Sequence, residues 1–351
     1  MLDWSKGYSC EWHLYEVNRE TWADGDEIRG VRSASVERDA TGEEPLIDSG
    51  TIDIDVPVGS DWVERYVRLA MVARQGNDAQ RVDVATMLAP RNGGTVDRGT
   101  DTASLSCVSV LWPASKRMMA PGDFAPKGCD GAEWAARILA SAINAPVSHS
   151  GSFTLEEHYV FDLGTSAISA AWTLVNAGGF TIMTNGRGEV SVGPKPTTAD
   201  LRLDTASAKL LLPSIAHELD WSSVPNRYMA MEDEVFAQAV NDDPDSLTST
   251  ATRGYVRDPD DGIDDAPTRV DGESLRGYCE RRLEELSMLP DMRTYTRKWW
   301  PGVHPGSLVV GTLSSVGIEG EMRVERQSLQ CGAGLFVEER ASKEVYAWRR
   351  S

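Results

Sequence analysis

Residues 241–254 read NDDPDSLTSTATRG, from Asn241 to Gly254, and differ in composition from the segments on either side. The stretch has neither the apolar alternation of a buried strand nor the monotony of a Gly/Ser spacer. Asn, Asp, Pro, Ser and Thr each favour local turns and caps, through side-chain oxygens or through a fixed φ. We therefore predict an ordered polar loop between two structured segments.

The segments that flank this loop have regular patterns. Before it, the sequence VPNR at residues 224–227 leads into a predicted strand over residues 228–231. After it, residues 272–289 place four apolar side chains on one face of a predicted helix: Leu275, Cys279, Leu283 and Leu286. The remainder of the chain has antiparallel strand lengths. The loop thus leads into a helix and then into a β-rich C-terminal end.

The first third of the chain also has the pattern of β-strands separated by turns. In residues 51–58, TIDIDVPV, one predicted face carries Ile52, Ile54, Val56 and Val58, and the other carries Asp53 and Asp55. Five or six strands at such short spacing predict a small barrel or sandwich.

The middle of the chain predicts a small α+β unit. A helix is predicted over residues 130–146, capped by Asp130, with Trp134, Ile138 and Ala142 on its apolar face. A second helix begins at Thr165 or Ser166, ends at Gly178-Gly179 and carries an apolar stripe of Ile168, Ala171, Trp172 and Val175. Strand patterns on both sides of residues 185–188, NGRG, predict a tight hairpin. The fold class is therefore α+β and predominantly β, with a β-rich unit at each end.

The charge of the chain limits its function. Against 35 basic side chains stand 54 acidic ones among 351 residues, which gives a net charge of −19. Such a surface repels phosphates, so a specific nucleic-acid-binding protein is not expected. No apolar run reaches the roughly 20 residues of a membrane span, and the first residues lack a signal peptide. We expect a soluble protein made in a cytoplasm.

The sequence contains no recognisable catalytic or metal-binding motif. GxSxG, Walker and helix-opening GxGxxG patterns are absent, and the five cysteines and five histidines are scattered without zinc-like spacing. In the acidic turn at residues 258–265, matching Gly262 to the glycine of a calcium loop puts Arg257 and Pro259 at ligand positions, where neither can coordinate. We predict no enzyme, no metal and no cofactor, and a solvated turn at 258–265.

The polar loop resembles a motif of the hub proteins at the tail tip (baseplate) of long-tailed, siphovirus-like phages, especially phages of Actinobacteria. The pattern N-D-D-P-x-S-x-T-S-T-x-x-R-G is carried here by Asn241, Asp242, Asp243, Pro244, Ser246, Thr248, Ser249, Thr250, Arg253 and Gly254. Residues 162–194 resemble the helix-then-hairpin unit of that family. Residues 273–289 resemble the helix that leads into its final barrel.

The resemblance implies a fold and an architecture. Hub proteins of this kind carry two similar small β-barrels, one at each end of the chain, with a mixed α+β insert between them. The implied division is a first barrel at residues 1–113, an insert at 114–215, connecting strands with the polar loop at 216–271, and a helix with the second barrel at 272–351.

The resemblance also implies a structural role without catalysis. Three chains form a ring that joins the six-fold tail tube or distal tail ring to three-fold tip proteins and surrounds the DNA exit channel. The implied partners are two further copies, the distal tail or tail tube ring, the C-terminus of the tape measure protein, and other tail-tip or fibre proteins. The implied location is the virion tail tip, after synthesis in the host bacterial cytoplasm.

Two other functions stay open from the residues. A tail-associated peptidoglycan hydrolase is favoured only by the surplus of carboxylates, and a hub of a contractile injection machine would have the same fold. If DNA leaves through the ring, part of the acidic surplus should line the channel, because acidic walls repel phosphates. Asp53 and Asp55 are the candidate channel-lining acids, and the turn at 258–265 is a weaker candidate.

Overall fold

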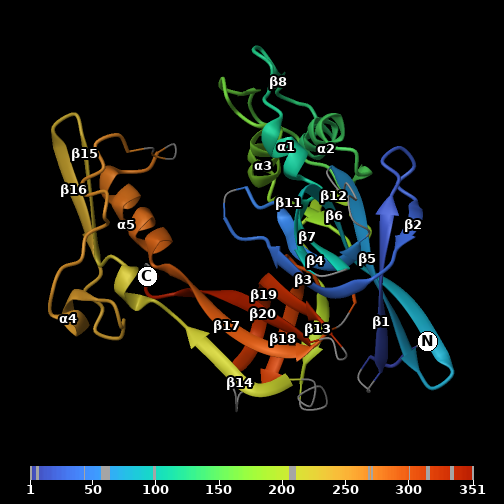
Figure 1. Ribbon diagram of the computed structural model, residues 1–351. Coiled ribbons are helices and arrows are strands. Elements are labelled where there is room, and N and C mark those ends of the chain that lie inside the picture. Colours follow the sequence, from blue (N-terminus) through green and yellow to red (C-terminus); the bar gives the residue numbers. More distant parts are fainter. Residues whose placement is uncertain are drawn as a thin grey trace. The chain divides into compact units, whose positions relative to one another are not determined.

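The computed structural model describes residues 2–4, 8–42, 44–56, 64–97, 100–204, 211–267, 269, 272–299, 301–313, 317–332 and 336–349. The chain is predominantly β and divides into two compact units (Figure 1). The first unit contains residues 1–215 and 294–341, and the second contains residues 216–293 and 342–351. The four-part division at residues 113, 215 and 271 stays a prediction.

The first unit begins with seven antiparallel strands, which we call the N-terminal strand group. They are β1 (Ser9–Val17), β2 (Asp24–Ile28), β3 (Val31–Asp39), β4 (Ile47–Val56), β5 (Arg65–Gln75), β6 (Asp78–Asp97) and β7 (Thr100–Ser109). They pair in the order β3-β4-β7-β6-β5-β1-β2. Ile52 and Ile54 are fully buried, as the alternation in TIDIDVPV predicts, whereas Val58 and the side chain of Val56 lie outside the described part of the chain.

A second set of six strands forms the C-terminal strand group. They are β13 (Ala199–Leu203), β14 (Leu211–Glu218), β17 (Met288–Lys298), β18 (Leu308–Leu313), β19 (Ile318–Cys331) and β20 (Phe336–Tyr346). β14, β17, β20 and β19 are neighbours in that order, β18 pairs with β19, and β13 runs parallel to β18. One apolar cluster takes side chains from all six strands, among them Leu203, Tyr295, Val309, Met322 and Ala341.

Strand β19 belongs to both strand groups. Its first part, from Ile318 to Arg323, pairs with β18, and its last part, from Arg326 to Cys331, pairs with β3. The two β-rich ends of the chain therefore form one continuous sheet, which the sequence did not predict. No sheet closes into a barrel among the described residues.

The N-terminal strand group nevertheless curls back toward β19. Cys10 and Trp12 lie on β1, six strands away from β19 in the sheet order. The Cys10 thiol and the Trp12 indole N–H both donate to the carbonyl oxygen of Gly332, each at 3.1 Å. These contacts bring β1 beside Gly332, the residue that directly follows β19. A curled sheet of this kind encloses its apolar side chains without a second layer.

The insert between the two groups contains the predicted helices and hairpin. Its elements are α1 (Trp112–Lys116), β8 (Phe124–Ala125), α2 (Gly131–Ala142), β9 (Val147–His149), β10 (Tyr159–Val160), α3 (Ala167–Ala177), β11 (Phe180–Thr184) and β12 (Val190–Pro194). Ser166 caps α3, and the predicted stripe Ile168, Ala171, Trp172 and Val175 is buried. Figure 1 shows the three helices gathered on one side of the N-terminal strand group.

Helix α2 has the predicted cap, and its predicted apolar side chains lie beside its most deeply buried face. Asp130 caps α2 as expected, since its side chain accepts a hydrogen bond from the Ala132 N–H at 3.0 Å. Trp134, Ile138 and Ala142 are only half-buried, however, and the buried face is made of alanines with Leu139. The small alanine side chains allow α2 to pack closely, while bulky side chains occupy the rim. The predicted stripe thus packs against the core cluster, next to a face of alanines that the spacing of large side chains did not single out.

The tight turn of the predicted β11–β12 hairpin is fixed to the N-terminal strand group. The Arg187 carbonyl accepts from the Trp22 indole at 2.8 Å and from the Arg68 guanidinium at 3.1 Å, and the Gly186 carbonyl accepts from the Thr86 hydroxyl at 3.0 Å. A Cβ atom at Gly186 would lie 1.8 Å from the carbonyl oxygen of Asp83. Only glycine fits there, so this turn holds the insert in a fixed register on the sheet.

The second unit consists of a hairpin, a helix and the polar loop. Strands β15 (Arg227–Glu232) and β16 (Val235–Val240) pair antiparallel, and α5 (Leu275–Leu286) packs Tyr278, Cys279 and Leu283 against one hairpin face. The short elements η2 (Trp221–Ser223) and α4 (Thr250–Arg253) complete it. The predicted strand at 228–231 and the predicted helix are both confirmed. No helix in the described part of the chain is both long and apolar enough to span a membrane.

Candidate functional site

The polar loop is built around the buried side chain of Asn241. Its amide Nδ2 donates to the hydroxyls of Ser246 at 2.9 Å and Thr248 at 3.4 Å. Its backbone N–H donates to the Asn226 carbonyl at 2.8 Å, and its own carbonyl accepts from the Thr250 N–H at 2.9 Å. Asn241 thus connects the end of β16 to three later positions of the loop, and it is fully buried.

Other motif residues fix the two ends of the loop. The Ser246 hydroxyl donates to the Ala347 carbonyl at 2.7 Å, which ties the loop to the C-terminal segment of the same unit. The Ser249 hydroxyl caps α4 by accepting from the Thr252 N–H at 3.1 Å. Arg253 donates to the carbonyls of Val224, at 2.6 Å, and Trp221. At the end of α4, Gly254 takes a left-handed φ of 72°, where glycine carries no steric cost.

The motif residues divide into an inner and an outer set. Asn241, Ser246, Thr248 and Ser249 are buried, and Thr250 and Arg253 are half-buried. The outer set is exposed and contains Asp242, Asp243, Pro244 and Gly254. The inner set satisfies backbone and side-chain groups within the unit, so it acts as a structural lock. Only the outer set can meet another molecule.

The candidate channel acids lie in the first unit, on the outer face of β4. Asp53 is half-buried and accepts a hydrogen bond from the Ser33 hydroxyl at 2.6 Å. Asp55 is exposed, and its carboxylate lies 2.6 Å from the Arg32 guanidinium. The two acids therefore share a face, as predicted, and the motif loop belongs to the other unit.

These two acids are part of a wider face of small polar side chains. The pairing registers of β19, β3, β4 and β7 place residues of alternate positions on the face opposite the core. That face carries Arg326, Ser328 and Gln330 of β19, Ser33, Ser35, Glu37 and Asp39 of β3, Ser49, Thr51, Asp53 and Asp55 of β4, and Ser104, Ser106 and Val108 of β7. Most of these side chains are small and polar or acidic. Arg326 is paired with the Glu37 carboxylate at 3.3 Å, and Val108 packs against the apolar cluster that contains the insert helices.

The acidic turn is tied down from within the second unit. Asp258 receives two hydrogen bonds from the Arg227 guanidinium, at 2.7 and 2.8 Å, and this pairing lowers the pKa of Asp258. Asp264 accepts from the hydroxyls of Tyr278 and Tyr228, and these bonds lower its pKa. Asp261 and Asp265 stay exposed. Half of the turn is therefore structural rather than solvated, and the described residues contain no cluster of three or more metal ligands.

Sequence reasoning missed a buried charge network in the first unit. The carboxylate of Glu339 on β20 is completely buried and contacts Arg297 at 2.5 Å, the Tyr295 hydroxyl at 2.6 Å and the Gln327 amide at 2.7 Å. Burial by itself raises a carboxyl pKa, but Arg297 and these hydrogen bonds hold the pKa of Glu339 below its ordinary value. Glu339 is therefore ionised and fully satisfied inside the protein.

The network continues across β19 to the N-terminal strand group and the insert. Arg38 on β3 donates to Gln327 at 3.3 Å and lies 3.3 Å from the carboxylate of Asp48. Asp48 in turn accepts from the Thr184 hydroxyl of β11 at 2.6 Å. Burial raises the pKa of Asp48, against the lowering effect of Arg38. One chain of contacts thus links both strand groups and the insert hairpin.

A sequence signal for this network exists. On β17 the buried positions alternate through Asp291, Arg293, Tyr295 and Arg297, and on β20 Glu339 stands between the buried Val337 and Ala341. A charged residue in phase with the buried positions of a strand predicts a buried ion pair. The phase alone does not name the partner, because the pairing of strands is not visible in the sequence.

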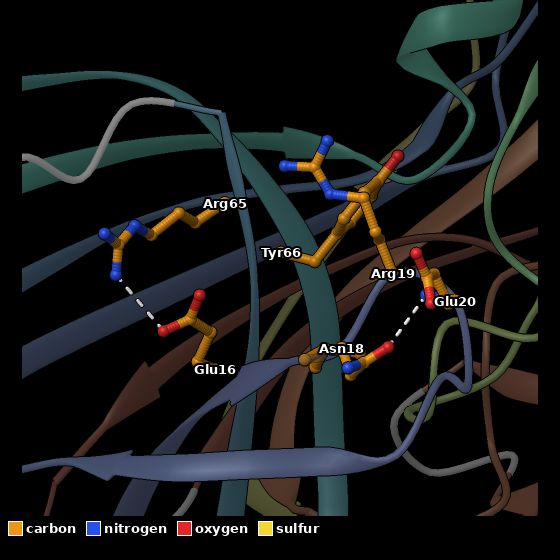
Figure 2. A pocket seen from close by; sticks show the side chains of 7 residues that line it. Glu16, Asn18, Arg19, Glu20, Arg65 and Tyr66 are labelled. Atoms are coloured by element: carbon orange, nitrogen blue, oxygen red, sulfur yellow. Dashed lines mark hydrogen bonds and ion pairs between the residues drawn. The ribbon is translucent and has the colours of Figure 1, made fainter.

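A hollow at the surface of the first unit is a candidate for an active site. Figure 2 shows its lining, with Arg65 paired to the Glu16 carboxylate at 3.2 Å and the Asn18 side chain accepting from the Glu20 N–H at 2.9 Å. The Tyr66 hydroxyl donates to the side chain of Asn144 at 3.3 Å. These polar groups satisfy one another or cap a turn. The lining contains no nucleophile beside a general base among the described residues, so the hollow does not favour catalysis.

No family model and no curated protein matches this sequence. Two solved structures resemble the fold along almost the whole chain. The tail protein from Neisseria meningitidis MC58 superposes with a TM-score of 0.64 at 15% identity, over 95% of this chain and 96% of that one. The 43 kDa tail protein of prophage MuSo2 from Shewanella oneidensis gives 0.64 at 13% identity, over 97% and 99%.

The chain has the fold of these tail proteins. A chain of the Francisella PdpA–VgrG complex is also similar, with a TM-score of 0.56 at 7% identity over 99% of this chain and 60% of that one. At such identities the likeness concerns the fold alone. It agrees with the predominantly β class expected from the sequence, whereas a specific relation to phages of Actinobacteria has no support in these matches.

Proposed function

We propose that this chain is a structural hub protein of a phage tail tip, which acts as one of three copies in a ring around the DNA exit channel. The observation that carries the proposal is the match of the whole chain to two tail proteins, over at least 95% of each chain. This likeness of fold extends over both compact units of the chain.

The two strand groups support the threefold arrangement. Each has its own apolar cluster, and β19 pairs with strands of both. In the proposed ring they are the two barrel domains of the hub, so three chains present six strand groups. Six similar surfaces can meet a six-fold tail tube or distal tail ring, while the ring itself keeps three-fold symmetry for the proteins below.

The outer face of β19, β3, β4 and β7 supports a channel wall. Its side chains are small hydroxyls with Asp53, Asp55 and Glu37, and the nearby Arg32 and Arg326 are each paired with a carboxylate. A wall of this kind neither attracts nor holds phosphates, because these residues offer them no unpaired cation. The net charge of −19 per chain acts in the same direction. We assign this face to the channel.

The proposed role needs partners but no turnover. The partners are two further copies, the tail tube or distal tail ring, the C-terminus of the tape measure protein, and other tip or fibre proteins, in the virion tail tip. The buried carboxylates are held in ion pairs and hydrogen bonds, which is the arrangement of structural acids. A hydrolase that cleaves the glycan strands of peptidoglycan would need two free carboxyl groups facing one cleft.

Electron microscopy of the purified chain, alone and with a tail tube protein, tests the proposal. We expect rings with three-fold symmetry in which Asp53 and Asp55 face the central opening. A neutral or basic inner wall with both acids outside would contradict the assignment of this face to the channel, but not the proposed role as a hub. Zymography separates the enzymatic alternative, because a clearing band that disappears on a single Asp or Glu substitution would contradict a purely structural role.

A further inference from the structure

Strand β16 has one free edge. The turn residues Asp233 and Glu234 have left-handed φ values of 45° and 65°, which is the two-residue turn that leaves Glu232 and Val235 as a hydrogen-bonded pair. At the open end of the hairpin, the Asn241 N–H bonds to the Asn226 carbonyl at 2.8 Å, so Asn226 and Asn241 are also a hydrogen-bonded pair. Since bonded and non-bonded pairs alternate, the N–H and C=O groups of Phe236, Gln238 and Val240 point away from β15.

On the opposite edge of the same hairpin, the outward backbone groups of β15 are hydrogen-bonded to a neighbouring segment. On β15, Met229 and Met231 pair with Gln238 and Phe236, so their backbone groups also point away from the hairpin partner. The Met231 N–H donates to the Asp264 carbonyl at 2.8 Å, and the Met229 carbonyl accepts from the Asp264 N–H at 3.0 Å. On β16 no backbone bond beyond the hairpin involves residues 235–240 within the described part of the chain. One edge is therefore covered and the other is not.

The free edge lacks the usual protection against pairing. Exposed edge strands normally carry charged residues, proline or a bulge. Residues 235–240 read VFAQAV and contain no charge and no proline. Phe236 is 52% exposed and lies with Met231 on the face that α5 does not cover, and Val235, on the other face, is 61% exposed. This edge can form a ladder of about 20 Å with another strand.

Exposed acids stand at both ends of the free edge. Asp233 and Glu234 precede β16, and Asp242, Asp243 and Asp245 follow it. None of these five carboxylates forms an ion pair among the described residues, whereas the neighbouring Glu232 is paired with Arg269 at 2.6 Å. An apolar centre with acidic ends is complementary to an apolar segment that has basic residues on both sides.

We propose that β16 receives an extended segment of another protein by strand addition, and that this segment has apolar side chains between two basic ends. The backbone groups of Phe236, Gln238 and Val240 supply the hydrogen bonds, and the side chains of Phe236 and Val240 contact alternate side chains of the incoming segment. The acids at each end of β16 attract the basic residues and fix the register.

A second copy of the chain is the wrong occupant for this edge. Two β16 strands pairing antiparallel would place residues 233–234 of one copy beside residues 242–245 of the other, so that acids would meet acids at both ends. Such a contact is also two-fold and closes as a dimer. The inference concerns the second unit alone, and it stands whether or not the chain forms the proposed ring.

Binding of a labelled peptide to the full chain tests the inference. The probe is KKVTVTVTKK, and its matched control carries Glu in place of all four Lys. We expect the Lys peptide to bind at least tenfold more tightly than the Glu peptide, with an affinity that falls as salt rises. On binding, hydrogen exchange should slow at the amides of Phe236, Gln238 and Val240. Equal affinity for both peptides, or protection elsewhere in the chain, would overturn the proposal.

Two variants locate the binding on the edge. Gln238→Pro removes an outward N–H without removing a bond to β15, so the Lys peptide should bind at least tenfold more weakly, while Gln238→Thr should bind like the wild type. Asp233→Asn with Glu234→Gly keeps the turn and removes two acids, and should also weaken binding severalfold. If that double variant binds the Lys peptide unchanged, or if Gln238→Pro abolishes a dimer of the wild-type chain, strand addition from another protein is wrong.

Discussion

The polar loop of the second unit and the charge network of the first unit both contain buried polar side chains, but the partners of those side chains lie at different distances along the sequence. Both bury polar side chains and satisfy them. In the loop, the Asn241 side chain meets partners five and seven positions away, while Ser246 also reaches Ala347, 101 positions away. In the network, Arg38 and Gln327 are 289 positions apart. The inner contacts of the loop therefore depend on local sequence, whereas the network can form only when the two ends of the chain have met.

The difference also bears on what each region stabilises. Loss of a neutral hydrogen bond in the loop exposes or leaves unpaired one small polar group. Loss of a charge in the network leaves an ion in the interior, which costs several times more. We therefore expect the network to dominate the stability of the first unit and the loop to adjust the shape of the second.

The largest effect is expected from Glu339→Gln. The change leaves the buried Arg297 guanidinium without its counter-charge and should lower the free energy of unfolding by about 3–5 kcal/mol. Glu338→Gln is the matched control, because the neighbouring Glu338 is exposed. Urea unfolding of both variants measures the difference. If the two variants unfold together with the wild type, the network does not carry the stability assigned to it.

A pH effect is expected from His304, which faces Arg38 and Arg297. Burial, followed by those two cations, lowers the pKa of His304 to about 3 from 6.5. Below pH 6.5 the His304 side chain is protonated in the unfolded chain but stays neutral in the folded chain. The contribution of neutral His304 to the free energy of unfolding is therefore complete above pH 6.5 and is lost as pH falls toward 3. Between pH 8 and pH 5 the loss should be about 2 kcal/mol.

The same experiment on His304→Gln isolates that contribution from the carboxylates. Both proteins should lose stability in acid, but the variant should lose about 2 kcal/mol less between pH 8 and pH 5. Parallel pH profiles would mean that His304 titrates as an ordinary exposed histidine.

A smaller effect is expected in the loop. Asn241→Ala removes the donor to Ser246 and Thr248, and should cost about 1–2 kcal/mol, since Ser246 keeps its bond to Ala347. Asp242→Asn, at the exposed neighbouring position, should change stability by less than about 0.5 kcal/mol. Thermal unfolding with a probe in the second unit compares them. A cost for Asn241→Ala as large as that for Glu339→Gln would erase the contrast between the two regions.

The smallest effect has the opposite sign. Glu234 has a left-handed φ of 65° in the β15–β16 turn, where glycine is free of the steric cost. Glu234→Gly should therefore stabilise the second unit by about 0.5–1 kcal/mol. Glu232→Gly, in the strand before the turn, is the contrasting control and should destabilise the unit.

The sequence predicted well where the partners are close in the chain. The caps by Asp130 and Ser166, the hairpin at 185–188 and the order of the polar loop depend on residues within a few positions. The core face of β4 followed from period-two alternation at Ile52 and Ile54. Local preference and periodicity contain this information directly.

The sequence did not predict what depends on distant pairing. The sharing of β19 requires knowledge that its second half meets β3, and the buried charges follow from that pairing. On α2 the spacing of the large side chains did not single out the most deeply buried residues, which are alanines and Leu139, because close packing against α3 favours small side chains. The roles of Asp53, Asp55 and the exposed motif acids depend on other molecules and stay proposals.

The mass of the assembled protein tests the central claim most directly. Native mass spectrometry of the purified chain, over a range of concentrations and in the presence of a tail tube protein, should show a species of about 115 kDa, three times the 38.4 kDa chain. A chain that stays at 38.4 kDa under all these conditions, or that closes as a two-fold dimer, would contradict a three-membered hub.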